Sequence, residues 1–108
     1  MEEKIKMISA AARVLSFRKQ YPLAIDEEVF QDVSDYISEI QGLKDEKIKR
    51  GMIAAASKAF EISRKNPKLI EKEVLREVLK EIPVILENLK EEKNEIHNNI
   101  ENGPDGIW

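Results

Sequence analysis

Four carboxylates stand at helical spacing in the segment between residues 26 and 41. Steps of four, three and four residues place them on one face of a helix. Clustered carboxylate oxygens are the ligands that Mg²⁺ and Ca²⁺ prefer, so one interpretation is a metal site and a metal-dependent enzyme built on it. The competing interpretation is an ordinary solvated helix face. The four residues, called the acidic stripe below, are Glu28, Asp32, Asp35 and Glu39.

The next segment, residues 44–68, has the opposite charge, with eight basic residues against three acidic ones. Clustered Lys and Arg neutralise phosphates, so this basic segment raises the interpretation of a nucleic-acid-associated factor. The net charge of −3 and the lack of a helix-turn-helix or zinc-finger signature count against it. Alternatively, the basic and acidic segments attract each other across the fold. The basic residues are Lys44, Lys47, Lys49, Arg50, Lys58, Arg64, Lys65 and Lys68.

Other residue types with reactive chemistry are scarce. The chain has no cysteine, which excludes disulfides, thiol nucleophiles and thiolate metal sites. His97 is its single histidine and has no Glu three residues before it, so a di-iron helical bundle is excluded. We therefore expect no catalytic residue and no cofactor. Trp108 follows Gly-Pro-Asp-Gly and is either a frayed end or an apolar anchor for the bundle or a partner.

An internal repeat dominates the organisation of the chain. Residues 7–37 align without a gap onto residues 52–82 at an offset of 45, and ten of the 31 aligned positions are identical. Such self-similarity indicates a duplicated supersecondary unit. The identical positions are Met7/Met52, Ile8/Ile53, Ala10/Ala55, Ala11/Ala56, Pro22/Pro67, Ile25/Ile70, Glu28/Glu73, Val29/Val74, Val33/Val78 and Ile37/Ile82.

Each repeat has the apolar periodicity of two amphipathic helices. In the first repeat, helices are predicted from residue 3 to about 19 and from Asp26, as N-cap, to a C-terminal Gly42-Leu43 motif. In the second repeat, Asp45 caps a helix to about residue 65, and Asn66-Pro67 is predicted to begin the next one. The alanine triplets 10–12 and 54–56 predict that the first helices of the two repeats cross there, because small side chains let backbones approach closely.

The end of the chain departs from the repeat. Pro83 stands where the first copy has Ser38, and an interior proline kinks or breaks a helix. Apolar residues then continue to Ile100, which predicts a kinked or separate fifth helix that ends at Gly103-Pro104. We expect one domain over residues 1–102, with repeats at about 3–41 and 45–82, an extension at 83–102 and a short tail at 103–108.

Each repeat has one apolar face that it cannot bury alone. The sequence therefore predicts an all-α fold in which a duplicated helical hairpin forms a four-helix, pseudo-twofold bundle. The favoured function is a non-catalytic protein-protein interaction or adaptor module, whose partner is another protein or a second copy in a homodimer. With no signal peptide and no membrane-spanning run, we expect a cytoplasmic protein. Charged residues make up 36% of the chain, which resembles thermophile usage.

Overall fold

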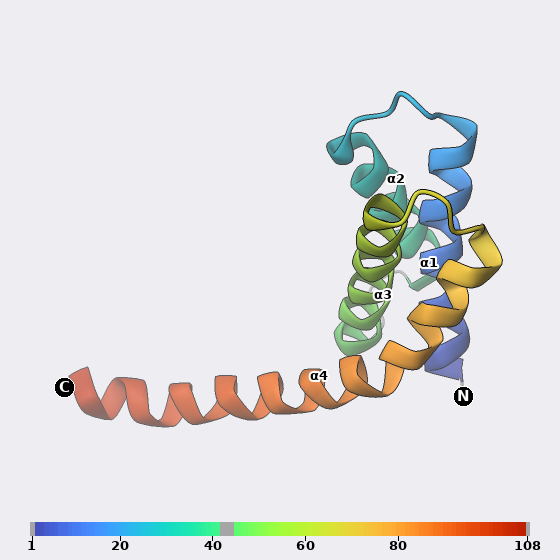
Figure 1. Ribbon diagram of the computed structural model, residues 1–108. Helices are drawn as coiled ribbons and strands as arrows, with labels where there is room; N and C mark the ends of the chain where they lie inside the picture. The colour runs from blue at the N-terminus through green and yellow to red at the C-terminus, as the bar shows by residue number, and fades with distance from the viewer. Residues whose placement is uncertain (1, 42–44, 108) are drawn as a thin grey trace.

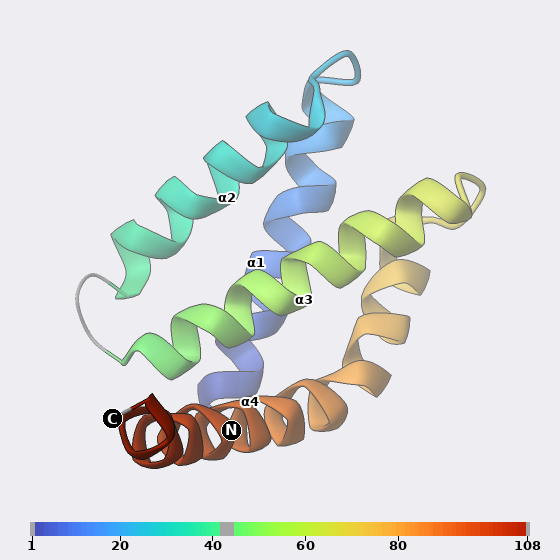
Figure 2. The same ribbon diagram turned by 90° about the vertical axis from the view of Figure 1, so that its left-hand side faces the viewer.

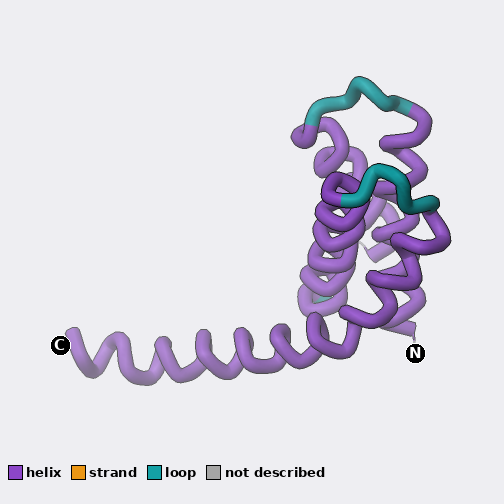
Figure 3. Tube along the Cα trace, viewed as in Figure 1, coloured by secondary structure: helices purple, strands orange, loops and turns teal. Residues whose placement is uncertain are grey.

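Four α-helices and no strand make up the part of the chain that the structure describes (Figures 1 and 3). The structure is a computed structural model that describes residues 2–41 and 45–107, with side chains at 2–41 and 45–90. The helices are α1 (Glu2–Gln20), α2 (Asp26–Gln41), α3 (Glu46–Lys65) and α4 (Glu71–Ile107). The prediction of an all-α bundle is therefore confirmed.

The pair formed by α1 and α3 lies at the centre of the bundle, and its helices cross as Figure 2 shows. Both α2 and α4 pack against this pair, but within the described residues they do not contact each other. Four alanines of the central pair, Ala10, Ala11, Ala55 and Ala56, are fully buried. The two helices can approach closely here because no larger side chain separates their backbones, as the alanine triplets predicted.

The core uses matching positions of the two halves of the chain. Buried residues recur at an offset of 45 in sequence, on α1 and α3 and again on α2 and α4. Identical side chains fill most of these positions, and Leu15 corresponds to Phe60. The buried pairs are Met7/Met52, Ala10/Ala55, Ala11/Ala56, Val14/Ala59, Leu15/Phe60, Val29/Val74, Val33/Val78 and Ile37/Ile82.

The beginnings of α2 and α4 differ from the sequence prediction. The carbonyl of Ile25 accepts the first helical hydrogen bonds of α2, so Ile25 and not Asp26 is the N-cap. Its own N–H donates to Glu28 Oε1 at 2.9 Å, one half of a capping box. The same bonds recur at α4, where Ile70 N–H donates to Glu73 Oε1 at 3.0 Å.

This arrangement also overturns the predicted role of Asn66-Pro67. Asn66 closes α3, since its N–H donates to the Ile62 carbonyl at 3.0 Å. The helix α4 begins later, because only at Ile70 does a carbonyl accept helical bonds and a carboxylate reach the free N–H. By contrast, Asp45 caps α3 as predicted, and its carboxylate accepts from the backbone N–H groups of Lys47 and Ile48 at 3.1 and 3.3 Å.

One helix, α4, extends through Pro83 without interruption, so the predicted alternative of a separate fifth helix is wrong. Its first half packs on the bundle, and its ribbon then turns away within the part coloured for residues 80–90 (Figure 1). A proline removes only one helical hydrogen bond. On the C-terminal side of Pro83, the side chains of Ile85, Leu86 and Leu89 pack against the core. These contacts retain the helix where the backbone bond is lost.

The crossing of α1, α3 and α4 explains the glycine inside α3. Gly51 is buried, and a Cβ at this position would lie 3.3 Å from Met7 Sδ and 3.5 Å from Leu89 Cδ1. A larger residue would have to displace the side chains of both neighbouring helices. Gly51 therefore lies where side chains of α1 and α4 both pack closely against α3.

The remaining predictions about chain segments have different outcomes. The helix α4 is assigned to Ile107, so the end predicted at Gly103-Pro104 is wrong; a proline removes one backbone donor, and the helix continues past that position. The Gly42-Leu43 motif and Trp108 lie outside the described residues. None of the helices, as far as they are described, has an apolar stretch long enough to span a bilayer.

Candidate functional site

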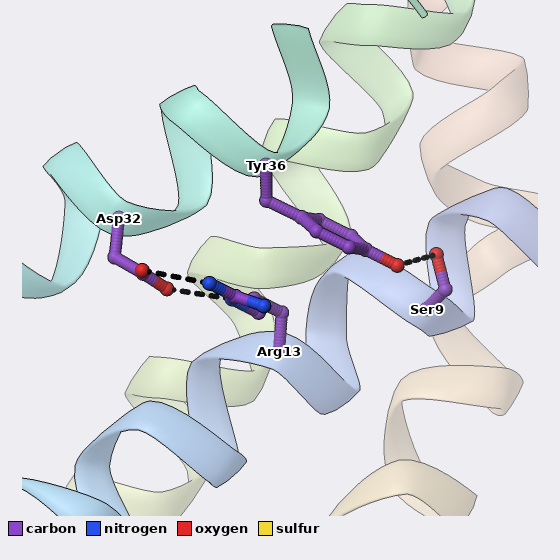
Figure 4. Close-up of polar contacts among 4 residues, drawn as sticks. All are labelled: Ser9, Arg13, Asp32 and Tyr36. Carbon is purple, nitrogen blue, oxygen red and sulfur yellow. Dashed lines mark hydrogen bonds and ion pairs between the residues drawn. The ribbon is translucent and has the colours of Figure 1, made fainter. Parts of the chain in front are cut away.

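A polar cluster joins α1 to α2 on the surface of the first hairpin. Arg13 donates to Asp32 through Nε at 2.8 Å and through Nη2 at 3.0 Å. Its guanidinium also lies 5.1 Å from the centre of the Tyr36 ring, and the Tyr36 hydroxyl donates to Ser9 Oγ at 3.2 Å. Figure 4 shows the guanidinium between the carboxylate and the ring. The hydrogen bond with Asp32 raises the pKa of Arg13, so this cation stays charged and paired.

The carboxylates of the acidic stripe do not converge on one point in the described structure. Asp32 is held by Arg13, Glu28 caps Ile25, and Asp35 Oδ1 accepts from Gln31 Nε2 at 3.0 Å. No three carboxylate or imidazole groups converge in the part of the chain whose side chains are described. Three of the four carboxylates therefore have separate partners, and the metal site considered for the stripe stays a prediction.

Residues of the basic segment are spread along α3 and interleaved with acids. Lys49 pairs with Glu46 at 3.8 Å, and Lys58 pairs with Glu61 at 3.4 Å and with Glu81 of α4 at 4.0 Å. The positions of Lys47, Arg50 and Lys65 are on α3, Lys68 is in the following loop, and Lys44 lies outside the described residues. The segment thus neutralises acids of its own helix and of α4 as well as facing solvent.

One ion pair connects the basic segment to the acidic helix. Arg64 Nη1 lies 3.3 Å from Asp26 Oδ2, at the start of α2. The guanidinium of Arg64 also lies 5.4 Å from the centre of the Phe60 ring, while Arg18 lies 5.0 Å from the same ring and donates to Ser63 Oγ. Opposite charges therefore meet across the bundle at this point, as one of the sequence interpretations anticipated.

The end of the bundle with the α1–α2 loop exposes large apolar side chains. Leu23 is 95% exposed, Ile25 57% and Tyr21 51%, and these three residues are called the loop surface below. Tyr21 and Leu23 border a surface groove of about 580 Å³, lined by Phe17, Gln20, Tyr21, Pro22, Leu23, Ala24 and Glu28. Apolar side chains clustered around a concave surface are typical of binding sites.

The α3–α4 loop lies at the same end and has the same backbone but different side chains (Figures 1 and 2). Its hydrogen bonds from Asn66, Leu69, Glu73 and Val74 match those of the first loop at an offset of 45. The side chains diverge, since Asn66 replaces Tyr21 and Lys68 replaces Leu23. Because the two loops share their backbone hydrogen bonds but differ in side chains, the loop conformation does not require a leucine at position 23.

Sequence reasoning missed the loop surface. It noted Pro22 and Ile25 only as positions shared by the two repeats, and it gave Tyr21 and Leu23 no role. The exchange of Leu23 for Lys68 between otherwise matching loops was the available signal. The residue proposed as an anchor, Trp108, and the side chain of His97 lie outside the described residues, so the structure places neither.

A second depression, of about 390 Å³, lies between the two loops. Pro22 and Pro67, which correspond at an offset of 45, both line it, as do Arg18 and Ser63. The Arg18 guanidinium is already engaged by Ser63 and the Phe60 ring. The depression therefore contains one engaged cation, Arg18, beside Lys19 and Glu71.

No protein-family model, curated protein or solved structure matches this chain. Its function has to be inferred from the contacts, exposures and charges given above.

Proposed function

We propose that this protein is a non-catalytic protein-protein interaction module and that the loop surface is its docking site. The observation that carries the proposal is the near-complete exposure of Leu23 between two other exposed apolar residues, Tyr21 and Ile25. Burying one exposed leucine side chain is worth about 1.5–3 kcal/mol. A partner that covers Tyr21 together with Leu23 gains from two of the side-chain types that best support such contacts, an aromatic and a branched aliphatic group.

The rest of the fold supplies a rigid support for this surface. Phe17 packs against the core, and its ring lies 4.8 Å from that of Tyr21, so the α1 end of the groove is held by the bundle. Binding at a preorganised surface loses less conformational entropy than binding through a disordered segment. The groove is thus suited to recognition, and its one lining carboxylate, Glu28, already accepts the backbone N–H of Ile25.

The duplicated hairpin, as we propose it, is a pseudo-twofold scaffold in which one copy was specialised. The shared core and loop hydrogen bonds support a common origin of the two halves. The first copy then has an apolar loop, and the second has Asn66 and Lys68 at the corresponding places. Fusion of a twofold dimer is a simple route to such a chain.

The test compares three baits in a native lysate: the wild type, Leu23→Lys and Ile5→Lys. Leu23→Lys installs the residue found in the second loop, so its loop backbone is expected to survive. Ile5 is 64% exposed on α1, which makes Ile5→Lys a matched control away from the loops. We expect proteins that the wild type and Ile5→Lys both retain to be lost from Leu23→Lys. Equal retention by all three baits would refute the docking site.

A nucleic-acid factor and a metal-dependent enzyme are less well supported as alternatives. The basic segment has three of its cations in ion pairs, namely those of Lys49, Lys58 and Arg64. The acidic stripe has Asp32 in an ion pair and Glu28 in a helix cap. Salt-dependent binding to nucleic acid, or thermal stabilisation by Mg²⁺ with nucleotide, would reinstate the corresponding alternative.

A further inference from the structure

The loop surface opens into a groove that continues along α1 and α2. The depression of about 580 Å³ beside Leu23 shares Phe17, Gln20 and Tyr21 with a smaller one of about 210 Å³. The smaller depression reaches Arg13 and Asp32 of the polar cluster. The two adjacent depressions are together called the α1–α2 groove below, which is apolar at the loop end and polar at the other.

The α2 border of this groove is strongly acidic. Glu28 lines its loop end and Asp32 its far end, and Asp35 and Glu39 continue the same helix face. Helix α2 has six acids and neither Lys nor Arg in its sequence. Among the described residues, ion pairs involve only Asp26 and Asp32 of these six. A net negative charge therefore remains beside an apolar groove.

The groove's only described cation, Arg13, does not reverse this balance. Both its Nε and its Nη2 face Asp32, and its guanidinium lies against the Tyr36 ring. On the other side of Pro22, Arg18 and Lys19 line the separate depression between the loops. The charged side chains that line the α1–α2 groove are thus two carboxylates and one cation, and that cation is already paired with Asp32.

The second hairpin lacks this combination of properties. Its positions equivalent to the acidic stripe are Glu73, Glu77, Lys80 and Val84, and its loop has Lys68 where the first has Leu23. Lys80 pairs with Glu77 at 3.0 Å, which further reduces the negative charge. An exposed loop leucine and a neighbouring helix face with four acids and no Lys or Arg occur together only on the first hairpin of the described bundle.

We propose that the α1–α2 groove binds a basic, amphipathic segment of a partner protein. An apolar side chain of this segment fills the space beside Phe17, Tyr21 and Leu23, and its Lys or Arg residues lie along the carboxylates of α2. Electrostatic complementarity of this kind selects partners and speeds association. The same carboxylates repel nucleic acid, anionic membranes and acidic peptides. This inference rests on the proposed function and specifies its partner.

A displayed library of random 16-residue peptides provides the probe. Peptides selected on the wild-type protein are sequenced, synthesised with a fluorophore and titrated by anisotropy. We expect selected sequences rich in Lys or Arg and in large apolar residues. Their affinity is expected to fall with added salt, since screening shortens the reach of charges from about 10 Å at 0.1 M to about 3 Å at 1 M.

Three variants separate the apolar and the electrostatic contributions. Leu23→Lys is expected to weaken binding at least about tenfold, as loss of an interface hot spot does. Asp35→Asn combined with Glu39→Gln should weaken it by about three- to tenfold and flatten its salt dependence. Glu77→Gln with Glu87→Gln removes two exposed carboxylates of α4 and should have no effect. Circular dichroism melts of each variant exclude unfolding as the cause.

The outcomes distinguish this inference from the function on which it rests. Binders that need Leu23 but are acidic or neutral would overturn the basic partner and leave the docking site standing. Binders that ignore Leu23 would overturn both. Binding of the protein to phosphatidylserine vesicles through Leu23, without peptide binding, would replace a protein partner by a membrane. Selection of segments from this chain, with a dimer mass in light scattering, would identify a second copy and overturn a distinct partner.

Discussion

Gly51 offers a quantitative test of how closely three helices approach one another. A Cβ placed there lies 3.3 Å from Met7 Sδ, 3.5 Å from Met7 Cγ and 3.5 Å from Leu89 Cδ1. Alanine fits if the flexible Met7 side chain moves by a few tenths of an ångström. Replacing a helical glycine by alanine also gains about 1 kcal/mol of helix propensity. We therefore expect Gly51→Ala to change the free energy of unfolding by less than about 1 kcal/mol.

Gly51→Leu should behave differently, because its branched side chain has to displace both Met7 and Leu89. Overpacking of this kind destabilises a core by about 1–3 kcal/mol. Urea denaturation followed by circular dichroism measures the change. The double variant Met7→Ala/Gly51→Leu should be more stable than the sum of the single effects predicts, by about 0.5–3 kcal/mol, since the residues touch.

A wild-type free energy of unfolding for Gly51→Leu, or strict additivity with Met7→Ala, would refute this packing. Either result would also undermine the path of α4 beyond Pro83, because Leu89 reaches Gly51 only if the helix continues and turns as described.

Three further predictions concern stability. Ile37→Ala and Ile82→Ala remove buried side chains at matching positions, and each should lower the free energy of unfolding by about 2–5 kcal/mol in urea titrations; a large cost at one site alone would contradict the matching cores. Asp32→Asn should cost less than about 1 kcal/mol by the same assay, because the Arg13 side chain of this pair is 43% exposed; a larger loss would mean that the polar cluster organises the hairpin. The charge-rich composition predicts a thermal midpoint above the mesophile range of about 45–65 °C in calorimetry, and a value inside that range would remove the thermophile interpretation.

The helices and most of the core could be predicted from sequence because both depend on local periodicity. Val29, Val33 and Ile37 recur at helical spacing, and the second copy repeats them, so the buried face was defined twice. The caps at Ile25 and Ile70 were missed because an isoleucine has no side-chain acceptor. At each cap the backbone N–H of the isoleucine donates to the glutamate three residues later, Glu28 or Glu73, and the isoleucine side chain makes no hydrogen bond.

Two features depended on tertiary structure and could not be read from the sequence. Whether Pro83 ends or bends a helix is decided by the packing of Leu86 and Leu89 beyond it, which no local pattern reports. The exchange of Leu23 for Lys68 between the repeats was compatible with a surface position, but it did not establish that Leu23 is exposed. An apolar residue in a loop packs inward or projects outward according to the path of the backbone. The candidate site depends on tertiary structure in the same way, so its residues were identified only from the structure.

Site-specific photo-crosslinking tests the central claim, that the α1–α2 loop is a protein-docking surface, most directly. A photoreactive amino acid replaces Leu23 in one variant and Lys68 in another, at equivalent positions of two loops with the same backbone bonds. After irradiation in a native lysate, we predict a discrete covalent adduct of higher mass from position 23 and none from position 68. Adducts from both positions, or from neither, would contradict the claim.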